Sequence, residues 1–149
     1  MTTQKYLSTI RLYGSKVEMA LQEIARLEQL ACSTSAPPMD REKVQSSRQG
    51  DRLGNSITKL IDIEREDYLN FAFKRKEIIG QIEKLDNPER EVLIRRYVYG
   101  NRNVDIAESM HMSERHISRL ISNGLRCFES RFGHIYLHLS DVMLQEFEK

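Results

Sequence analysis

Tryptophan is absent from this sequence of 149 residues, which also has only three prolines, seven glycines and two cysteines. Such a composition favours helices over a sheet sandwich with its many turns. The cysteines, Cys32 and Cys127, form no CxxC pair, and the four histidines lack the spacing of metal ligands. We therefore expect two reduced thiols, no metal and no cofactor.

Long apolar runs are missing too, so no segment is expected to span a bilayer. Glu18, Glu23 and Glu28 occupy the region where a signal peptide would need an apolar block. We expect a soluble, cytoplasmic protein with no membrane partner. Lys and Arg number 23 against 22 Asp and Glu, giving a net charge of +1, so any nucleic-acid footprint must be local.

The residue patterns of common enzyme sites are also lacking. His111, His116, His134 and His138 have no carboxylate or cysteine partner at a fixed spacing, and no glycine-rich phosphate loop is present. We predict no catalytic residues and expect that the protein is not an enzyme.

Apolar residues recur at helical spacing in the first half of the chain. The pattern predicts a helix over residues 4–31, a mobile loop at about 32–50 that contains Pro37 and Pro38, and a long helix over residues 51–85. Residues 1–85 should thus form a helical hairpin, a coiled-coil-like interaction region. The predicted buried positions include Leu7, Ile10, Val17, Leu21 and Ile24, followed by Leu53, Ile57, Leu60, Ile61, Phe71, Ile78, Ile82 and Leu85.

Residues 86–132 predict a helix-turn-helix domain. Asp86 or Asn87 can cap its first helix, and Gly100 can end that helix. A short helix from Asn103 to about Met110 then precedes a longer helix that Ser113 caps.

The turn between the last two helices has a typical set of residues. Ala107 provides the small side chain that two crossing helices need, and Met112 should fill the turn. His111 stands where many such turns have glycine, and histidine is among the residues that tolerate a positive φ.

The C-terminal segment, residues 133–149, carries two patterns. Ile135, Leu137 and Leu139 alternate as in a strand, whereas Leu139, Val142 or Met143, and Phe147 suit a helix. We expect a short packing helix there. The predicted fold class is all-α: a long N-terminal helical hairpin followed by a helix-turn-helix bundle.

The outer face of the longer helix follows from its inner face, which is assigned to Ile117 and to Leu120 or Ile121. The early turns of such a helix enter the major groove, where arginine can contact guanine and glutamate can accept from cytosine. The same charges would suit the solvated surface of an ordinary three-helix bundle. The outward residues are Glu114, Arg115, Ser118, Arg119 and Ser122, and the candidates for phosphate contacts are Ser122, Arg95, Arg96, Arg102 and Arg126.

Residues 85–129 resemble region 4 of bacterial sigma-70-type factors. "NPEREVLIRRY" is similar to that family's first helix, and "DIAESMHMSERHISRLISNGLRCF" to its two following helices. By position, the resemblance implies that Glu114, Arg115, Ser118 and Arg119 are the base readers. Gly124 stands where the family prefers alanine, which predicts a close helix contact at that point.

The whole layout resembles small transcriptional regulators carried by phages and mobile elements of low-GC Gram-positive bacteria, to which the ArpU-type late-gene regulators are related. The segments "LIDIERE" and "KRKEIIGQIEKL" precede the sigma-like region in this layout. The resemblance implies transcriptional control with double-stranded DNA as partner. An aromatic-rich segment for holding melted DNA is missing, so a complete sigma factor is not expected.

Two other functions stay open. A small terminase-like DNA-packaging protein also joins a helix-turn-helix to a helical oligomerisation element. An interaction protein could bind RNA polymerase or an anti-sigma partner without reading bases. Because one helix-turn-helix reads few base pairs, we expect a homodimer through the N-terminal helices, with Ile10, Val17, Leu21, Ile24, Ile57, Leu60, Phe71 and Ile78 as candidates for its shared core.

Overall fold

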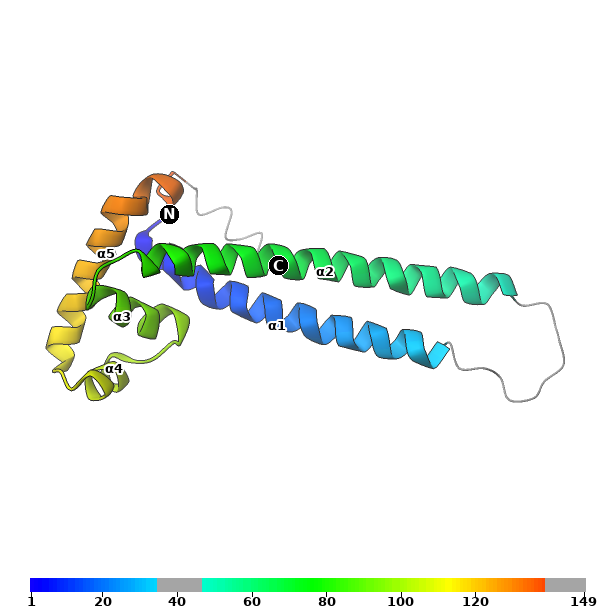
Figure 1. Ribbon diagram of the computed structural model, residues 1–149, viewed down its shortest axis with the longest axis horizontal. Helices are drawn as coiled ribbons and strands as arrows, with labels where there is room; N and C mark the ends of the chain where they lie inside the picture. Colours follow the sequence, from blue (N-terminus) through cyan, green and yellow to red (C-terminus); the bar gives the residue numbers. More distant parts are fainter. Residues whose placement is uncertain (35–46, 139–149) are drawn as a thin grey trace. The chain divides into compact units, whose positions relative to one another are not determined.

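The computed structural model describes residues 1–34 and 47–138. Within them the chain is helical and has no strand, which confirms the all-α class (Figure 1). The elements are α1 (Thr3–Thr34), α2 (Ser47–Glu83), α3 (Glu89–Leu93), the π-helical turn η1 (Ile94–Val98), α4 (Asn103–Met110) and α5 (Glu114–Tyr136).

The loop predicted at about residues 32–50 was too long at both ends. α1 continues to Thr34 and α2 begins at Ser47. The polar residues after Ala31 do not stop α1, because a helix needs no apolar side chain in every turn, and the Ser33 hydroxyl donates to the carbonyl oxygen of Leu30 at 2.8 Å. Pro37 and Pro38 lie outside the described residues.

The chain divides into two compact units, and both long helices contribute to each of them. Gly14–Phe73 form one unit, which we call the hairpin unit. Met1–Tyr13 and the described residues from Lys74 to 138 form the other, which we call the terminal unit. The compact unit around the helix-turn-helix therefore includes the start of α1 and the end of α2 in addition to the predicted segment 86–132.

In the hairpin unit, α1 and α2 run antiparallel along a narrow apolar seam (Figure 1). Leu27, Ile57 and Ile61 are buried in this seam, and Ile24 and Ala31 pack against them. On one edge the Arg65 guanidinium donates to the Glu28 carboxylate at 3.0 Å.

The predicted buried stripe was wider than two helices can cover. Leu21, Leu53 and Leu60 are each about half exposed, at 49%, 53% and 49%, because each helix has only one neighbour in this unit. Conversely, Ile10, Ile57 and Ile78 are buried within their own chain. These three isoleucines therefore cannot form the shared core of a dimer, which corrects that part of the expectation.

The terminal unit is built around aromatic side chains that join α1 to α5. The rings of Tyr6 and Tyr136 stack at a centroid distance of 4.3 Å. The Tyr136 hydroxyl donates to Thr3 Oγ1 at 2.9 Å, and the Thr3 hydroxyl donates to the Glu129 carboxylate at 2.8 Å. The main core of the unit consists of Tyr6, Leu7, Ile10, Ile78, Ile82, Leu85, Leu93, Phe128 and Tyr136.

The longest helix of this unit, α5, extends beyond the predicted domain end at residue 132. It runs without interruption to Tyr136, so the strand-like alternation that starts at Ile135 is not a strand there. The reason is packing, since Tyr136 is fully buried against Tyr6 on the helical period of α5. The predicted packing residues Leu139, Val142, Met143 and Phe147 lie outside the described residues.

Candidate nucleic-acid interface

The helix-turn-helix is held together by a small core of its own. Ala107 is buried at the crossing of α4 and α5, as predicted, together with Ile106 and Ile117. Leu120 is the buried member of the pair Leu120 and Ile121, and Ile121 is half-buried. Val92 of α3 completes this core, so the three helices fix the orientation of α5.

The turn between α4 and α5 has the predicted backbone. His111 adopts the left-handed conformation with φ of 54°, and the N–H of Met112 donates to the carbonyl oxygen of Ala107 at 2.9 Å. Ser113 caps α5, because its Oγ accepts from the N–H of His116 at 3.3 Å. Met112 was predicted to fill the turn, but it is 37% exposed, and Met110 packs against the core instead.

The entry into α3 differs from the prediction. α3 begins at Glu89, with Pro88 at the capping position and no side-chain cap. Asp86 instead accepts from the Arg131 guanidinium of α5 at 3.2 Å, so its carboxylate joins two elements and does not cap the helix. Gly100 ends the segment as predicted, with φ of 75°, and a Cβ at this position would lie 3.3 Å from Cζ of Arg11 in α1.

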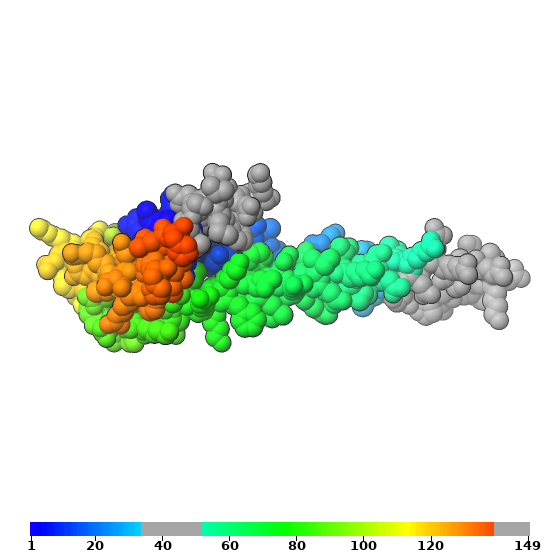
Figure 2. All heavy atoms as spheres, turned by 90° about the horizontal axis from the view of Figure 1, so that it is seen from above, coloured from blue at the N-terminus to red at the C-terminus, as the bar shows by residue number. Residues whose placement is uncertain are grey.

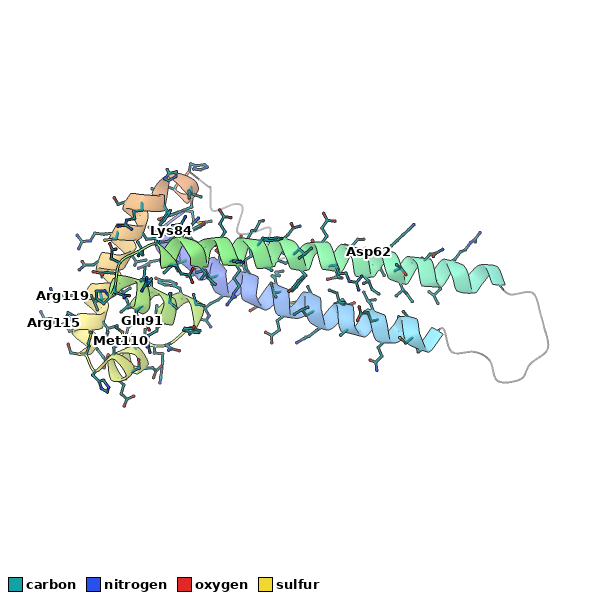
Figure 3. The ribbon with its side chains drawn as sticks, viewed as in Figure 1. Asp62, Lys84, Glu91, Met110, Arg115 and Arg119 are labelled. Atoms are coloured by element: carbon teal, nitrogen blue, oxygen red, sulfur yellow. The ribbon has the colours of Figure 1, made fainter. Side chains whose placement is uncertain are left out.

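The outer face of α5 carries a ridge of basic residues. Arg115, Arg119 and Arg126 recur at spacings of four and seven residues, opposite to the buried positions Ile117 and Leu120. All three arginines are exposed. Figure 3 shows Arg115 and Arg119 on the outer side of α5. This ridge presents guanidinium groups with five donors each, the chemistry that matches phosphate and guanine.

Arg115 and Arg119 have no hydrogen-bond or ion-pair partner among the described residues, unlike Arg95, Arg96, Arg102, Arg126 and Arg131. Arg126 donates to the Asn123 side chain at 2.9 Å. Arg96 donates to the carbonyl oxygen of Asn101 at 3.1 Å. The guanidinium groups of Arg115 and Arg119 are therefore free to contact a ligand without breaking an internal bond.

The Arg95 side chain, a predicted phosphate contact, ties η1 to both of its neighbours. Its Nε donates to Glu91 of α3 at 2.7 Å, and an NH group donates to Ser109 of α4 at 2.8 Å. Only 29% of the side chain is exposed. Arg95 thus has a structural role in the described contacts, and its contact with phosphate stays a prediction.

At the start of α4, Arg102 and Asp105 form a cap. The Asp105 carboxylate accepts from the backbone N–H of Arg102 at 3.1 Å and from its guanidinium at 3.2 Å. The guanidinium bond first, and the backbone bond after it, lower the pKa of Asp105. The same bond between guanidinium and carboxylate raises the pKa of Arg102. The Arg102 side chain is still 79% exposed, so its remaining donors point to solvent.

Two of the predicted base readers lie beside the ridge. The Ser118 hydroxyl accepts from the Asn103 side chain of α4 at 3.4 Å, and Glu114 is exposed in the first turn of α5. The Ser122 hydroxyl donates to the carbonyl oxygen of Ser118 at 2.9 Å. Ser118 and Ser122 are therefore engaged with the protein, in contrast to Arg115 and Arg119.

Asn103 was not predicted as a site residue, although it lies at the first position of α4 and reaches α5. Its Oδ1 is buried and has no hydrogen-bond partner among the described residues. Only its place at a helix start could have drawn attention to it, since no pattern tells which neighbouring helix an asparagine contacts.

Residues 82–128 match the family model for sigma-70, region 4, which confirms the resemblance at the level of a sigma-70 region 4-like helix-turn-helix. The match spans η1 and all of α3 and α4, together with the part of α5 that carries the ridge. It supports a DNA-binding role in regulation for this segment. No curated protein and no solved structure matches the chain.

Two further properties concern the described residues only. None of their helices combines the length and the apolar character that crossing a membrane requires. His, Cys, Asp and Glu side chains do not gather there in groups of three or more that could hold a metal ion.

Proposed function

We propose that the chain is a non-enzymatic, sequence-specific DNA-binding regulator of transcription that acts in the cytoplasm and is not a complete sigma factor. One observation carries the proposal: Arg115 and Arg119 are exposed, unpaired and one turn apart on the outer face of the second helix of a sigma-70 region 4-like helix-turn-helix. In that motif this is the face that enters the major groove.

The roles of the site residues follow from their place on α5 and around it. Arg115 and Arg119 contact base edges, with Glu114 and Ser118 beside them. Ser122 and Arg126 lie further along α5. In this proposal they contact the phosphates at the edge of the major groove. Arg95, Arg96 and Arg102 are further phosphate contacts in this proposal.

The wider setting is also part of the proposal. The layout of the chain supports a small regulator of a phage or mobile element of low-GC Gram-positive bacteria. RNA polymerase is a second proposed partner, because the matched family region belongs to polymerase-associated factors. A homodimer would place two reading helices on one DNA face, with half-sites about 34 Å apart or a multiple of it.

A selection from random duplexes with the purified full chain tests the proposal. The wild type should enrich one short motif, and Arg119→Ala should relax selection at one base position, at about 1–3 kcal/mol if the contact is bidentate. Arg115→Ala should do the same at another position. Lys76→Ala, which removes one exposed positive charge from α2, is the matched control and should leave the motif unchanged.

The alternatives predict other results. If both arginine variants select the same motif as the wild type, α5 does not read bases. If no duplex is enriched but the chain binds RNA polymerase, it is an interaction protein. A ring of many subunits would favour the terminase-like role.

A further inference from the structure

One side of the hairpin unit exposes five large apolar side chains. Three of them, Leu53, Leu60 and Ile63, come from α2. Leu53 and Leu60 are seven residues apart, Asp67 continues their row after another seven residues, and Ile63 lies within the same stripe. Their exposed fractions lie between 47% and 62%. We call this surface the apolar flank, and its members are Met19, Leu30, Leu53, Leu60 and Ile63.

A shallow groove connects the α1 and α2 parts of this flank. Met19 and Glu23 line it from α1, and Asp67 and Phe71 line it from α2. Because Asp67 continues the row of Leu53 and Leu60, these two leucines lie on the same side of the hairpin unit as Met19. Figure 2 looks onto α2, which lies over α1 along this unit.

The exposed apolar area of the flank is large enough to form an interface. Five half-exposed large side chains present on the order of 400 Å² of apolar surface, which is within the range of the largest patch on a typical monomer. Two such surfaces with their polar rims would bury on the order of 1,000 Å² in total, the lower limit of a specific interface. A second copy of the flank is therefore large enough to cover it.

Along α2, the charged residues beside the flank are basic first and acidic further on. Arg52 and Lys59 lie in its first half, and Glu64, Glu66 and Asp67 follow in the middle. None of these five side chains has an ion-pair partner among the described residues, unlike Arg65, which pairs with Glu28 and Asp62. A basic segment next to an acidic one is self-complementary only when two α2 helices run in opposite directions.

We propose that the apolar flank binds a second copy of the chain, with the two α2 helices antiparallel about a two-fold axis at the level of Asp62 (Figure 3). This inference deepens the homodimer of the proposed function and rests on it, since it names the surface and the register. Two-fold dimers are the commonest symmetric assemblies, and the same patch serves both subunits.

The register follows from matching apolar and charged residues at once. Leu53 lies opposite Phe71 of the second copy, and Leu60 lies opposite Ile63 of the second copy. Lys59 then lies opposite Glu66 of the second copy. The midpoint of the two residue numbers in each pair lies within one residue of position 62. A single two-fold axis at Asp62 can therefore relate all of these pairs.

Sedimentation of the full chain without DNA tests the surface. The wild type should be a dimer at micromolar concentration, and Leu60→Glu should raise the dissociation constant at least about tenfold, because it places a charge in an apolar contact. Leu69→Glu is the matched control, on the same helix with an exposed fraction of 50% against 49% for Leu60, and outside the row formed by Leu53 and Leu60. It should leave the dimer intact.

A charge exchange tests the register. Lys59→Glu or Glu66→Lys alone brings like charges together twice per dimer and should raise the dissociation constant about tenfold. The double variant restores opposite charges and should return the constant to within about threefold of the wild type. Helix content from circular dichroism shows whether each variant is folded.

The outcomes separate this inference from the proposed function. A 17.5 kDa wild-type monomer, or equal losses in Leu60→Glu and Leu69→Glu, would overturn the inference. Failure of the double variant to recover would overturn the antiparallel register. A dimer that selects no DNA motif would overturn the proposed function and leave the surface in place, because sedimentation is measured without DNA.

Discussion

Gly124 of α5 packs so closely against Leu93 of α3 that a Cβ at position 124 would lie 3.1 Å from Cδ1 of Leu93. The same Cβ would lie 3.3 Å from Cβ of Glu89. This contact brings the two helices together directly below the exposed ridge of α5. It confirms the close helix contact that the glycine predicted from the sequence.

Gly124→Ala should lower the free energy of unfolding by about 1 kcal/mol, because crowding in a packed contact costs about 1–3 kcal/mol and the gain in helix propensity offsets about 1 kcal/mol. Gly80→Ala in α2 is the control, since a Cβ there meets nothing within 4 Å. It should raise stability by about 0.5–1 kcal/mol. Urea unfolding measures both, and equal stabilisation by the two variants would contradict the close contact.

Arg95→Ala should destabilise the domain by about 1 kcal/mol, because it removes the bonds to Glu91 and Ser109 that join η1 to α3 and α4. Arg126→Ala breaks only a bond to Asn123 on its own helix and should change stability by less than about 0.5 kcal/mol. Thermal unfolding compares the two. A fully stable Arg95→Ala variant with weakened DNA binding would show that Arg95 serves phosphate contact alone.

The helices could be predicted from the sequence because their apolar residues follow the helical period, and the turn could be predicted because His111 tolerates its φ of 54°. The residues that pack against each apolar stripe could not be predicted. Periodicity places the apolar residues on one face of a helix, but it does not tell that the rings of Tyr6 and Tyr136 stack on each other. For the same reason the start of α1 was assigned to the hairpin alone.

For the site, the outward positions of α5 could be predicted from its inner face, which placed Arg115 and Arg119 correctly on the exposed side. The internal bonds of Arg95 and Ser118 could not be predicted, because they depend on the angle between helices that are close only in the fold. Likewise, the residue types at positions 94–98 do not indicate the π-helical turn.

Salt should weaken DNA binding only moderately. The phosphate candidates Arg95, Arg96, Arg102 and Arg126 each hold an internal bond, and the net charge of the chain is +1. If about four phosphates are contacted, the slope of log affinity against log salt concentration should be about −4. Titrations at several salt concentrations measure it. A slope as steep as about −8 would require a basic surface beyond these arginines.

Alkaline pH should unfold the terminal unit through its buried tyrosines. Burial raises the pKa of Tyr6 and of Tyr136 above the ordinary value of 10.0. The folded chain therefore holds these phenolic protons more tightly than the unfolded chain does. Their contribution to stability is complete below the ordinary tyrosine pKa, and it is lost as the pH rises from there through the raised pKa values of the folded state.

Phenylalanine variants can assign this loss to the stacked pair. The free energy of unfolding in urea, measured from about pH 8 to about pH 11, should fall less steeply in Tyr6→Phe and Tyr136→Phe than in the wild type, because each variant removes one titrating group. Tyr99→Phe is the control, since that side chain is 71% exposed, and it should keep the wild-type slope. The same steep fall in all three variants would mean that other groups cause the alkaline unfolding, and the stacked tyrosines would then have no part in it.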